Sequence, residues 1–417
     1  MGSIRSYEAA QLGISASTPR SLAGARSSFP GLEDQTFLDA ACVSLAPREA
    51  RDAIVEFLDM ALWCRESDAS EHHVAMDHAR RQAAGEAALL LNSPDRNLAL
   101  IESTTYGLNV AARAIPLRSG DNVLIADSEF LQVAIPWLAR RNDGIEVRSV
   151  ESQQGELPLE RFEEAIDRHT RVVCVSSVQW SSGYRVDIEG LGRLCRERDV
   201  WLVVDAVQEM GALKIDLSEQ PADFVIAGGH KWLNAPFGCG VMFMSDRALS
   251  ALTPSSYGYL SMEEPEGGWG TFFRTPGIPT VREYRFPQTA RQFEVGGTSN
   301  YPGAIGLAAS LRLVNSVGID VIDEQVRGLT RTLRHGLEER GARIISPPAP
   351  EARSGITTFM FYETPEEDHQ LLEKLLTDRI LISQRYTGPV GGLRVSTHFY
   401  NTEEDIEQLL DSLAHHT

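Results

Sequence analysis

Lysine is nearly absent from this chain of 417 residues. Three lysines stand beside 36 arginines, so guanidinium groups carry almost all of the positive charge. Lys214 and Lys374 occur in ordinary surface-like segments. Lys231 instead lies in VIAGGHKWLNAPFGCG (225–240), between an apolar run and a glycine-rich exit. A lysine in an apolar setting is a candidate for amine chemistry, because lost hydration disfavours its charged form.

Positive charge, cysteine and long apolar runs are also scarce. The formal net charge of −19 argues against nucleic acid and anionic membranes as partners, because such binding relies on Lys and Arg. No apolar run reaches the roughly 18–20 residues that span a bilayer, and the N-terminus lacks the apolar core of a signal peptide. We therefore expect a cytoplasmic protein whose partners are small molecules and other copies of itself.

The five cysteines are few, odd in number and widely spaced. Their number and spacing argue against a disulfide framework, and the absence of a CxxC pair argues against a cysteine-built zinc site. They are Cys42, Cys64, Cys174, Cys195 and Cys239. This usage is typical of a reducing compartment.

Short apolar runs alternate with amphipathic segments over the first 250 residues. Most runs lack the polar alternation of a half-exposed strand, so we expect both of their faces to be buried. The runs are 97–101, 122–126, 145–150, 171–177, 201–205, 223–227 and 240–244. Helical patterns cover 47–62, a second helix to about 90, 130–141, 158–168 and 188–198. This predicts an α/β fold with a mainly parallel seven-stranded sheet covered by helices.

The remaining segments predict a second, smaller domain. Residues 1–30 are expected to form a loose N-terminal arm, 31–300 the large domain, and 301–417 a small α+β domain with the N-terminal segment packing nearby. A long helical region is expected over 302–341. Residues 253–292 are rich in Gly, Pro and aromatics, which favours a packed active-site or interface loop.

Two polar residues follow a buried strand in VVDAVQ (203–208). In an open α/β sheet, ligands bind beyond the carboxyl ends of the strands. Asp205 could hold a cationic ring nitrogen there, as pyridoxal phosphate requires, and Gln208 could reach the phenolic oxygen of the same ring. The ordinary alternatives are an Asp that caps the next turn and a Lys231 that extends from a strand end to water.

Anion sites are indicated at three further places. Ser103, Thr104 and Thr105 begin a helix after a strand, where free N–H groups attract a phosphate. A plain N-cap is the alternative and needs one hydroxyl. FEVGGTSNYPG (293–303) is a second Gly-Thr turn before a helix, and Arg394 in LRVSTHFYN could clamp a carboxylate.

With these residues in view, the chain resembles class V aminotransferases over about residues 34–415. These fold-type I pyridoxal-phosphate enzymes include cysteine desulfurases, selenocysteine lyases, kynureninases and isopenicillin-N-epimerase-like proteins. The segments that carry the resemblance are FLDAACVSLAP (37–47), STTYGLN (103–109), VVDAVQEMG (203–211), GGHKWL (228–233), FEVGGTSN (293–300) and LRVSTHFYNTEEDIEQLL (393–410).

The resemblance implies a role for each candidate residue. Lys231 would form the internal aldimine and move the proton at Cα, while Arg394 would hold the substrate carboxylate. The cofactor ring would contact Asp205 and Gln208, with Phe130 stacked on it. Its phosphate would be bound by Thr104, Thr105 and His230, and by Thr298 from a second subunit of a homodimer.

Several positions depart from the desulfurase pattern. Phe130 stands where desulfurases stack a histidine, Trp180 where they tend to have an asparagine, and no cysteine follows Cys239. Gly228 replaces a frequent phosphate-binding Ser or Thr. A persulfide-donating desulfurase is therefore disfavoured, and the pattern is nearest the epimerase-like branch.

The sequence thus predicts a pyridoxal-phosphate enzyme acting on an amino acid, as an aminotransferase or a Cβ–S lyase. An epimerase and a non-catalytic binding protein of the same fold are the alternatives. A dinucleotide enzyme lacks support, because no GxGxxG follows the first strand.

Three constellations keep open roles. EHHVAMDH (71–78) spaces His73 and Asp77 as a metal site could, although a polar helix face is commoner. Cys42 could lie near the cofactor or be an inert buried thiol. Arg385 could be a second anion contact or a solvated arginine.

Overall fold

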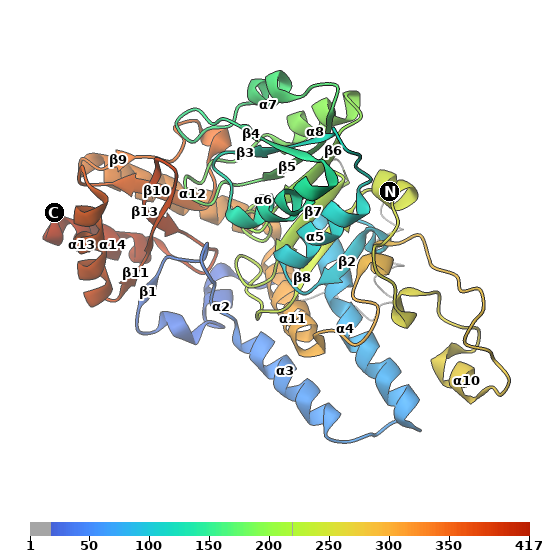
Figure 1. Cartoon of the computed structure of the whole chain (residues 1–417). Helices are drawn as coiled ribbons and strands as arrows, with labels where there is room; N and C mark the ends of the chain where they lie inside the picture. The colour runs from blue at the N-terminus through green and yellow to red at the C-terminus, as the bar shows by residue number, and fades with distance from the viewer. Residues whose placement is uncertain (1–17, 219) are drawn as a thin grey trace.

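The computed structural model describes residues 18–218 and 220–417, and a seven-stranded sheet forms its centre (Figure 1). Each predicted apolar run is a strand, with bounds within one residue of the prediction. The strands are β2 (Leu98–Ile101), β3 (Asn122–Ala126), β4 (Glu146–Val150), β5 (Thr170–Ser176), β6 (Trp201–Asp205), β7 (Phe224–Gly228) and β8 (Gly240–Met244).

The order across this sheet is β2-β8-β7-β6-β5-β3-β4. β8 runs antiparallel to both of its neighbours, β2 and β7, and the other strand pairs of this sheet are parallel. The carboxyl ends of β3, β5, β6 and β7 therefore meet at one edge, where ligands bind in open α/β sheets.

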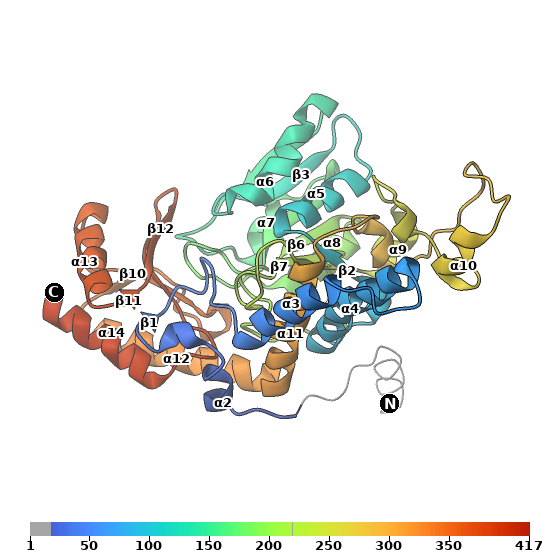
Figure 2. The same ribbon diagram turned by 90° about the horizontal axis from the view of Figure 1, so that it is seen from below.

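Helices cover both faces of the sheet (Figures 1 and 2). One face packs on α5 (Thr104–Ala114), α6 (Leu131–Leu138) and α9 (Asp246–Ala251). The other packs on α4 (Ala69–Leu91), α7 (Leu159–Ala165), α8 (Ile188–Glu197) and α11 (Tyr301–Val317), with α3 (Arg48–Ala61) lying against α11. Strand residues alternate between these two cores: Leu98 and Leu100 join one, Ala99 and Ile101 the other. Both faces of the strands are buried, which explains their continuous apolar runs.

The helical region predicted over 302–341 is two helices. Gly318, with φ of 91°, ends α11 and begins α12 (Ile319–Glu339). The two helices are bent by 80° at this break. Within the described residues no single helix has the length and apolarity of a membrane span, although α11 and α12 taken together pass that test.

A smaller antiparallel sheet lies toward the C-terminus, at the left of Figure 1. Its order is β12 (Ser383–Thr387), β13 (Val390–Ser396), β10 (Ile356–Met360) and β9 (Arg343–Ile344). It packs with α12, α13 (Pro365–Thr377) and α14 (Glu403–His416). β1 (Thr36–Phe37) pairs in parallel with β11 (Ile380–Leu381), so the early chain reaches this domain. The domain division stays a proposal. The packing of α11 with the large core favours a boundary at Gly318 rather than at residue 301.

The described part of the N-terminal arm is packed rather than loose. α2 (Leu22–Arg26) begins at Ser21, which accepts a bond from the Gly24 N–H. Arg26 forms an ion pair of 2.8 Å with Asp405, and Phe29 is 1% exposed. An aromatic anchor and an ion pair to the small domain explain this difference from the expectation. The rest of the predicted arm, residues 1–17, lies outside the described residues.

The stretch 253–292 contains the short helix α10 (Gly268–Arg274), which projects from the body in both views (Figures 1 and 2). The remaining short turns are 3-10 helices. They are η1 (Pro30–Leu32), η2 (Asp95–Asn97), η3 (Ala139–Asp143), η4 (Tyr259–Ser261), η5 (Ala290–Phe293) and η6 (Pro350–Ala352).

Candidate active site

A cavity of about 320 Å³ opens at the carboxyl edge of the large sheet. Eight of the nine predicted site residues line it. They are Thr104, Thr105, Phe130, Asp205, Gln208, His230, Lys231 and Arg394. Other lining residues include Cys42, Ser103, Ser176, Trp180 and Arg385. Thr298 does not line this cavity; it is exposed, in the turn before α11.

Lys231 follows β7 by three residues and its side chain lines the cavity. Burial lowers the pKa of the amine to about 8, and the charge of Asp205 only partly opposes this shift. Nζ lies 6.0 Å from the ring centroid of Phe130 and forms no ion pair with a described residue. An amine with this pKa is substantially neutral slightly above neutral pH, and the neutral form is the nucleophile.

Asp205 ends β6 and faces the same cavity. One carboxylate oxygen accepts a hydrogen bond of 2.9 Å from the Val207 N–H. Asp205 therefore also caps the next turn, which was the ordinary alternative to a role at the cofactor. The other oxygen makes no hydrogen bond within the described chain, which leaves it for a ligand. Burial raises the pKa of Asp205 to about 6, opposed by the Val207 N–H and by Lys231.

The start of α5 is built to receive an anion. Ser103 is the N-cap and accepts a bond of 3.1 Å from the Tyr106 N–H, while Thr104 Oγ1 accepts one of 2.9 Å from the Gly228 N–H. A Cβ at Gly228 would lie 3.0 Å from both Thr104 Oγ1 and His230 Nδ1. Glycine therefore lets β7 approach α5 closely, which a Ser or Thr here could not do without a shift.

His230 lies beside this helix start with its ring stacked on Phe237, centroids 5.1 Å apart. Burial, assisted by the charge of Lys231, lowers the pKa of His230 to about 4. The imidazole is therefore neutral at pH 7 and can donate one N–H to a phosphate. Helix N–H groups, hydroxyls and a neutral imidazole form a donor set that fits a phosphate group.

Gln208 already makes two bonds inside the protein. Its Nε2 donates to the Ala41 carbonyl at 3.0 Å, and its Oε1 accepts from Trp232 Nε1 at 2.8 Å. These bonds fix the amide orientation. One amide N–H is left for the predicted contact with a phenolic oxygen.

Phe130 and Trp180 form an aromatic wall of the cavity. Their rings meet edge to face with centroids 5.5 Å apart. Neither ring can transfer a proton, whereas the Lys231 amine in the same cavity can. The role of Trp180, open from sequence, thus includes support of Phe130.

Arg394 on β13 is 1% exposed, and its guanidinium is held from two sides. Nη1 donates to the Trp180 carbonyl at 3.0 Å, and Nη2 pairs with Asp39 at 3.1 Å. Ser383 donates to the same Asp39 oxygen at 3.0 Å. Sequence reasoning missed Asp39, although it lies within the quoted segment FLDAACVSLAP.

Glu129 is a second residue that sequence reasoning missed. Its carboxylate accepts from the Ser176 N–H at 2.6 Å and from Gln179 Nε2 at 3.0 Å. Burial raises the pKa of Glu129 to about 7, against the effect of these bonds. Because Glu129 precedes Phe130, this network fixes the backbone that presents the aromatic ring. An acid three residues after a strand end was the signal that the sequence offered.

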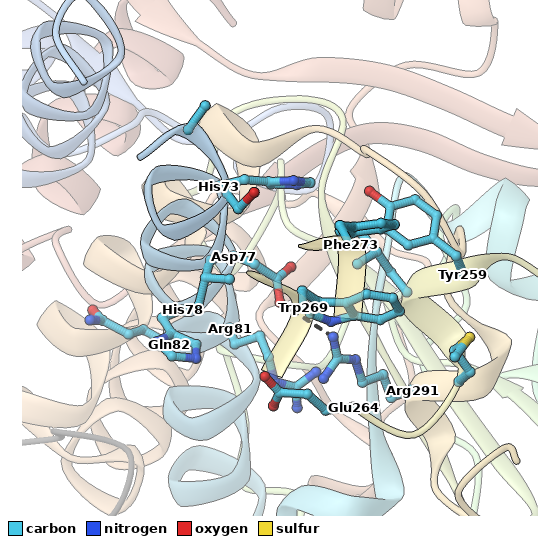
Figure 3. A pocket seen from close by; sticks show the side chains of 15 residues that line it. His73, Asp77, His78, Arg81, Gln82, Tyr259, Glu264, Trp269, Phe273 and Arg291 are labelled. Carbon is cyan, nitrogen blue, oxygen red and sulfur yellow. Dashed lines mark hydrogen bonds and ion pairs between the residues drawn. The ribbon is translucent and has the colours of Figure 1, made fainter. Parts of the chain in front are cut away.

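A second, larger cavity of about 610 Å³ lies between α4 and the 253–292 stretch (Figure 3). The sequence predicted that residues 253–292 form an active-site or interface loop. That stretch does line a cavity with α4, but a separate one, because α4 covers the sheet face away from the start of α5. Its walls include His73, Asp77, Tyr259, Trp269 and Arg291.

The histidines of residues 71–78 form no metal cluster within the described chain. Asp77 pairs with Arg291 at 3.3 Å and accepts from the Tyr301 hydroxyl at 3.3 Å (Figure 3 shows the first pair). His73 Nε2 also lies 3.3 Å from that hydroxyl. His73 and Asp77 therefore find their partners in Tyr301 and Arg291, outside this helix.

Comparison with known proteins places the chain in a family. The aminotransferase class-V model matches residues 36–409. Isopenicillin N epimerase of Streptomyces clavuligerus is 30% identical over 347 residues, 80% of this chain and 83% of that protein. A probable cysteine desulfurase of Methanothermobacter thermautotrophicus is 28% identical over 415 residues, 93% of this chain and 96% of that protein.

Solved structures show the same fold. The apo cysteine desulfurase of Thermococcus onnurineus NA1 superposes with a TM-score of 0.82 at 22% identity, covering 96% of this chain and 98% of the other. The cystine C-S lyase C-DES, solved with its product cysteine persulfide, gives 0.80 at 23% identity, covering 93% and 99%.

Fold and site together define a fold-type I pyridoxal-phosphate-dependent enzyme, a transferase or lyase. The predicted fold class and cofactor are thereby confirmed. The chain belongs to the aminotransferase class-V family.

Proposed function

We propose that the protein acts on an amino acid by aminotransfer or Cβ–S lysis, with pyridoxal phosphate held at Lys231. The observation that carries this proposal is the Lys231 amine, whose pKa is lowered to about 8, sharing a cavity with the free carboxylate oxygen of Asp205. When bound, the cofactor supplies an electron sink for a bond at the substrate Cα.

The residues of the chain divide the remaining work. The N–H groups at the start of α5, with Thr104, Thr105 and His230, would hold the phosphate. Asp205 would pair with the pyridine nitrogen, and Phe130 would cover the ring. Lys231 binds the cofactor and moves the proton at Cα, which its lowered pKa permits near neutral pH. Arg394 orients the substrate carboxylate, and the Phe130–Trp180 wall excludes water.

Epimerisation is the second candidate. The 30% identity to an isopenicillin N epimerase and the aromatic residue at position 130 both favour it. Epimerisation needs a proton returned to the opposite face of Cα. Cys42 lines the cavity and is the side chain we would test for that transfer.

The experiment is incubation of the holoenzyme with a panel of amino acids and three readouts. Keto acid formed only with a second amino acceptor supports aminotransfer. Sulfide with pyruvate supports lysis, and loss of the Cα hydrogen with inverted configuration supports epimerisation. If no panel member changes the cofactor absorbance or yields any product, the proposal is wrong.

A homodimer and a cytoplasmic location are part of the proposal. Exposed apolar side chains on and just after α3 support a subunit interface. They are Val55, Leu58, Leu62 and Trp63. Thr298 is exposed and is proposed to serve the partner's phosphate. Light scattering on the purified holoenzyme tests the dimer, and a monomer at micromolar concentration would contradict it.

A further inference from the structure

Arg385 is a cation of the Lys231 cavity that the proposed roles leave unused. It lines the cavity from β12 of the small domain. Nη1 donates to the neighbouring Gln384 carbonyl at 2.8 Å, and Nη2 lies 3.5 Å from Cys42 Sγ. Among the described residues it has no carboxylate at ion-pair distance, whereas Arg394 pairs with Asp39.

The backbone around Arg385 is held closely. It lies opposite Gly392 in the β12–β13 ladder, and Arg394 lies opposite Ser383. A Cβ at Gly391 would come within 2.1 Å of the Arg385 carbonyl oxygen, so glycine is required for the two strands to pair here. Arg385 and Ser383 are two residues apart in one strand, so their side chains share a face of the sheet. Arg394 lies opposite Ser383, so its side chain is on that face as well. Two residue steps separate the two arginines by roughly 7 Å along the strand.

The charges around the cavity leave one cation unmatched. Asp39 is a single carboxylate between two arginines, and its oxygen is bonded to Arg394 and Ser383. Asp205 lines the cavity from β6 of the large sheet and is committed to the cofactor ring under the proposed function. Acidic residues outnumber basic ones in this chain, whose net charge is −19. Even so, no described carboxylate lies at ion-pair distance from Arg385. The unmatched guanidinium therefore suits an anion brought by a ligand.

We propose that Arg385 binds an anionic group on the side chain of the substrate, so that the enzyme prefers acidic amino acids. This inference rests on the proposed function and deepens it. Arg394 then takes the α-carboxylate and Arg385 the distal carboxylate, at a spacing that matches a short dicarboxylic amino acid. Arg385 can form two parallel bonds to that group.

Paired substrates of equal size test the selectivity. We expect the wild type to have at least a tenfold higher kcat/KM for glutamate than for glutamine. Arg385→Gln should lower kcat/KM for glutamate about 10- to 100-fold, the effect of losing hydrogen bonds to a charged group, and change it less than about 3-fold for glutamine. Arg385→Lys should recover part of the loss. Arg331→Gln, an exposed arginine of α12, is the matched control and should change neither substrate.

Equal losses on both substrates would overturn the inference, because Arg385 would then serve the α-carboxylate or the fold. A wild type that prefers glutamine would overturn it as well. The melting temperature of each variant separates misfolding from lost recognition. If Arg385→Gln has a lowered melting temperature, the ratio of kcat/KM for glutamate to that for glutamine in Arg385→Lys decides whether Arg385 recognises the side chain.

Binding without turnover separates this inference from the proposed function. Calorimetry on the holoenzyme should give a 10- to 100-fold weaker Kd for glutarate in Arg385→Gln and an unchanged Kd for butyrate. An unchanged glutarate Kd would contradict the anion site. If Arg385-dependent glutarate binding occurs in a protein that turns over no amino acid, the proposed function fails and the anion site stands.

Discussion

The two cavities differ in how their charged groups are paired. Beside α4, Asp77 is bonded to Arg291 and Tyr301, and Arg81 pairs with Asp95 at 3.6 Å. At the sheet edge, Lys231 and Arg385 make no ion pair with a described residue, and one oxygen of Asp205 is unbonded. Asp77, Arg81 and Arg291 of the larger cavity are therefore ion-paired, whereas Lys231 and Arg385 of the smaller one, about half its volume, are not paired within the described chain.

The comparison teaches that unpaired charge, rather than size, indicates the reactive site. Keeping a buried ionisable group without a partner costs free energy, so it persists where a ligand or a reaction uses it. The walls differ too. The smaller cavity is built on strand ends of the sheet, and the larger one on α4 and a long connecting stretch. Catalytic side chains must be held in a fixed geometry, and strand ends hold them more precisely than a long connecting stretch does.

Removing the Lys231 amine should have the largest effect. Lys231→Ala is expected to lower kcat by at least about 10³-fold, because the cofactor loses its covalent attachment and Cα its proton carrier. The melting temperature should stay close to that of the wild type, since no ion pair is broken. Steady-state turnover and thermal melting measure both. Lys214→Ala, which loses an exposed pair with Asp320, is the control. If Lys231→Ala retained turnover, the cavity at the sheet edge would not be the reactive site.

Neutralising one acid in each cavity tests the comparison directly. Asp205→Asn should lower kcat about 10²-fold, because the amide cannot balance a protonated ring nitrogen. Asp77→Asn should leave kcat within about 2-fold and lower stability by about 1 kcal/mol through its pair with Arg291. Turnover and urea unfolding of both variants provide the measurement. A larger kcat loss in Asp77→Asn than in Asp205→Asn would mean that the α4 cavity is the site of chemistry.

Much of the smaller cavity could be predicted because its residues follow strands. An apolar run without alternation marks a strand buried on both faces, and the polar residue that ends it must lie at the sheet edge. That reasoning located Asp205, whereas Lys231 was located by the scarcity of lysine and by its apolar setting. Neither signal could find Asp39, whose partner Arg394 is 355 residues away in the chain.

The larger cavity and the break at Gly318 were beyond the sequence for the same physical reason. The meeting of α4 with residues 259–291 depends on tertiary packing, and neither segment has a local pattern that specifies the other. A single glycine inside a helical pattern gives no sign that its φ is positive. Glu129 was hidden because a buried acid is recognisable only with its hydrogen-bond partners in view.

The pH dependence of amine reactivity sharpens the comparison at an atomic level. In protein freed of cofactor, acetylation of Lys231 should rise through a pKa of about 8 and level off above about pH 9. The pKa of Lys214 is raised by its bond to Asp320, so its acetylation should still be rising there. At pH 8 about half of the Lys231 amines are neutral, roughly a hundred times the neutral fraction of an ordinary lysine. Mass spectrometry of both peptides gives the two profiles. Parallel profiles would show that Lys231 is an ordinary surface amine.

The smallest expected effect concerns single hydroxyls. Thr104→Val keeps the shape of the side chain and removes the acceptor of the Gly228 N–H, so stability should fall by about 1–2 kcal/mol. The affinity for pyridoxal phosphate should fall about 5- to 10-fold, because a phosphate donor is lost as well. Tyr301→Phe removes two longer bonds, to Asp77 and His73, from the other cavity. It should change stability by less than about 0.5 kcal/mol and leave cofactor affinity unaltered, because those bonds are weak and remote from α5. Thermal melting and cofactor titration, run side by side, decide between them. Equal cofactor affinities in the two variants would mean that the start of α5 does not bind the phosphate.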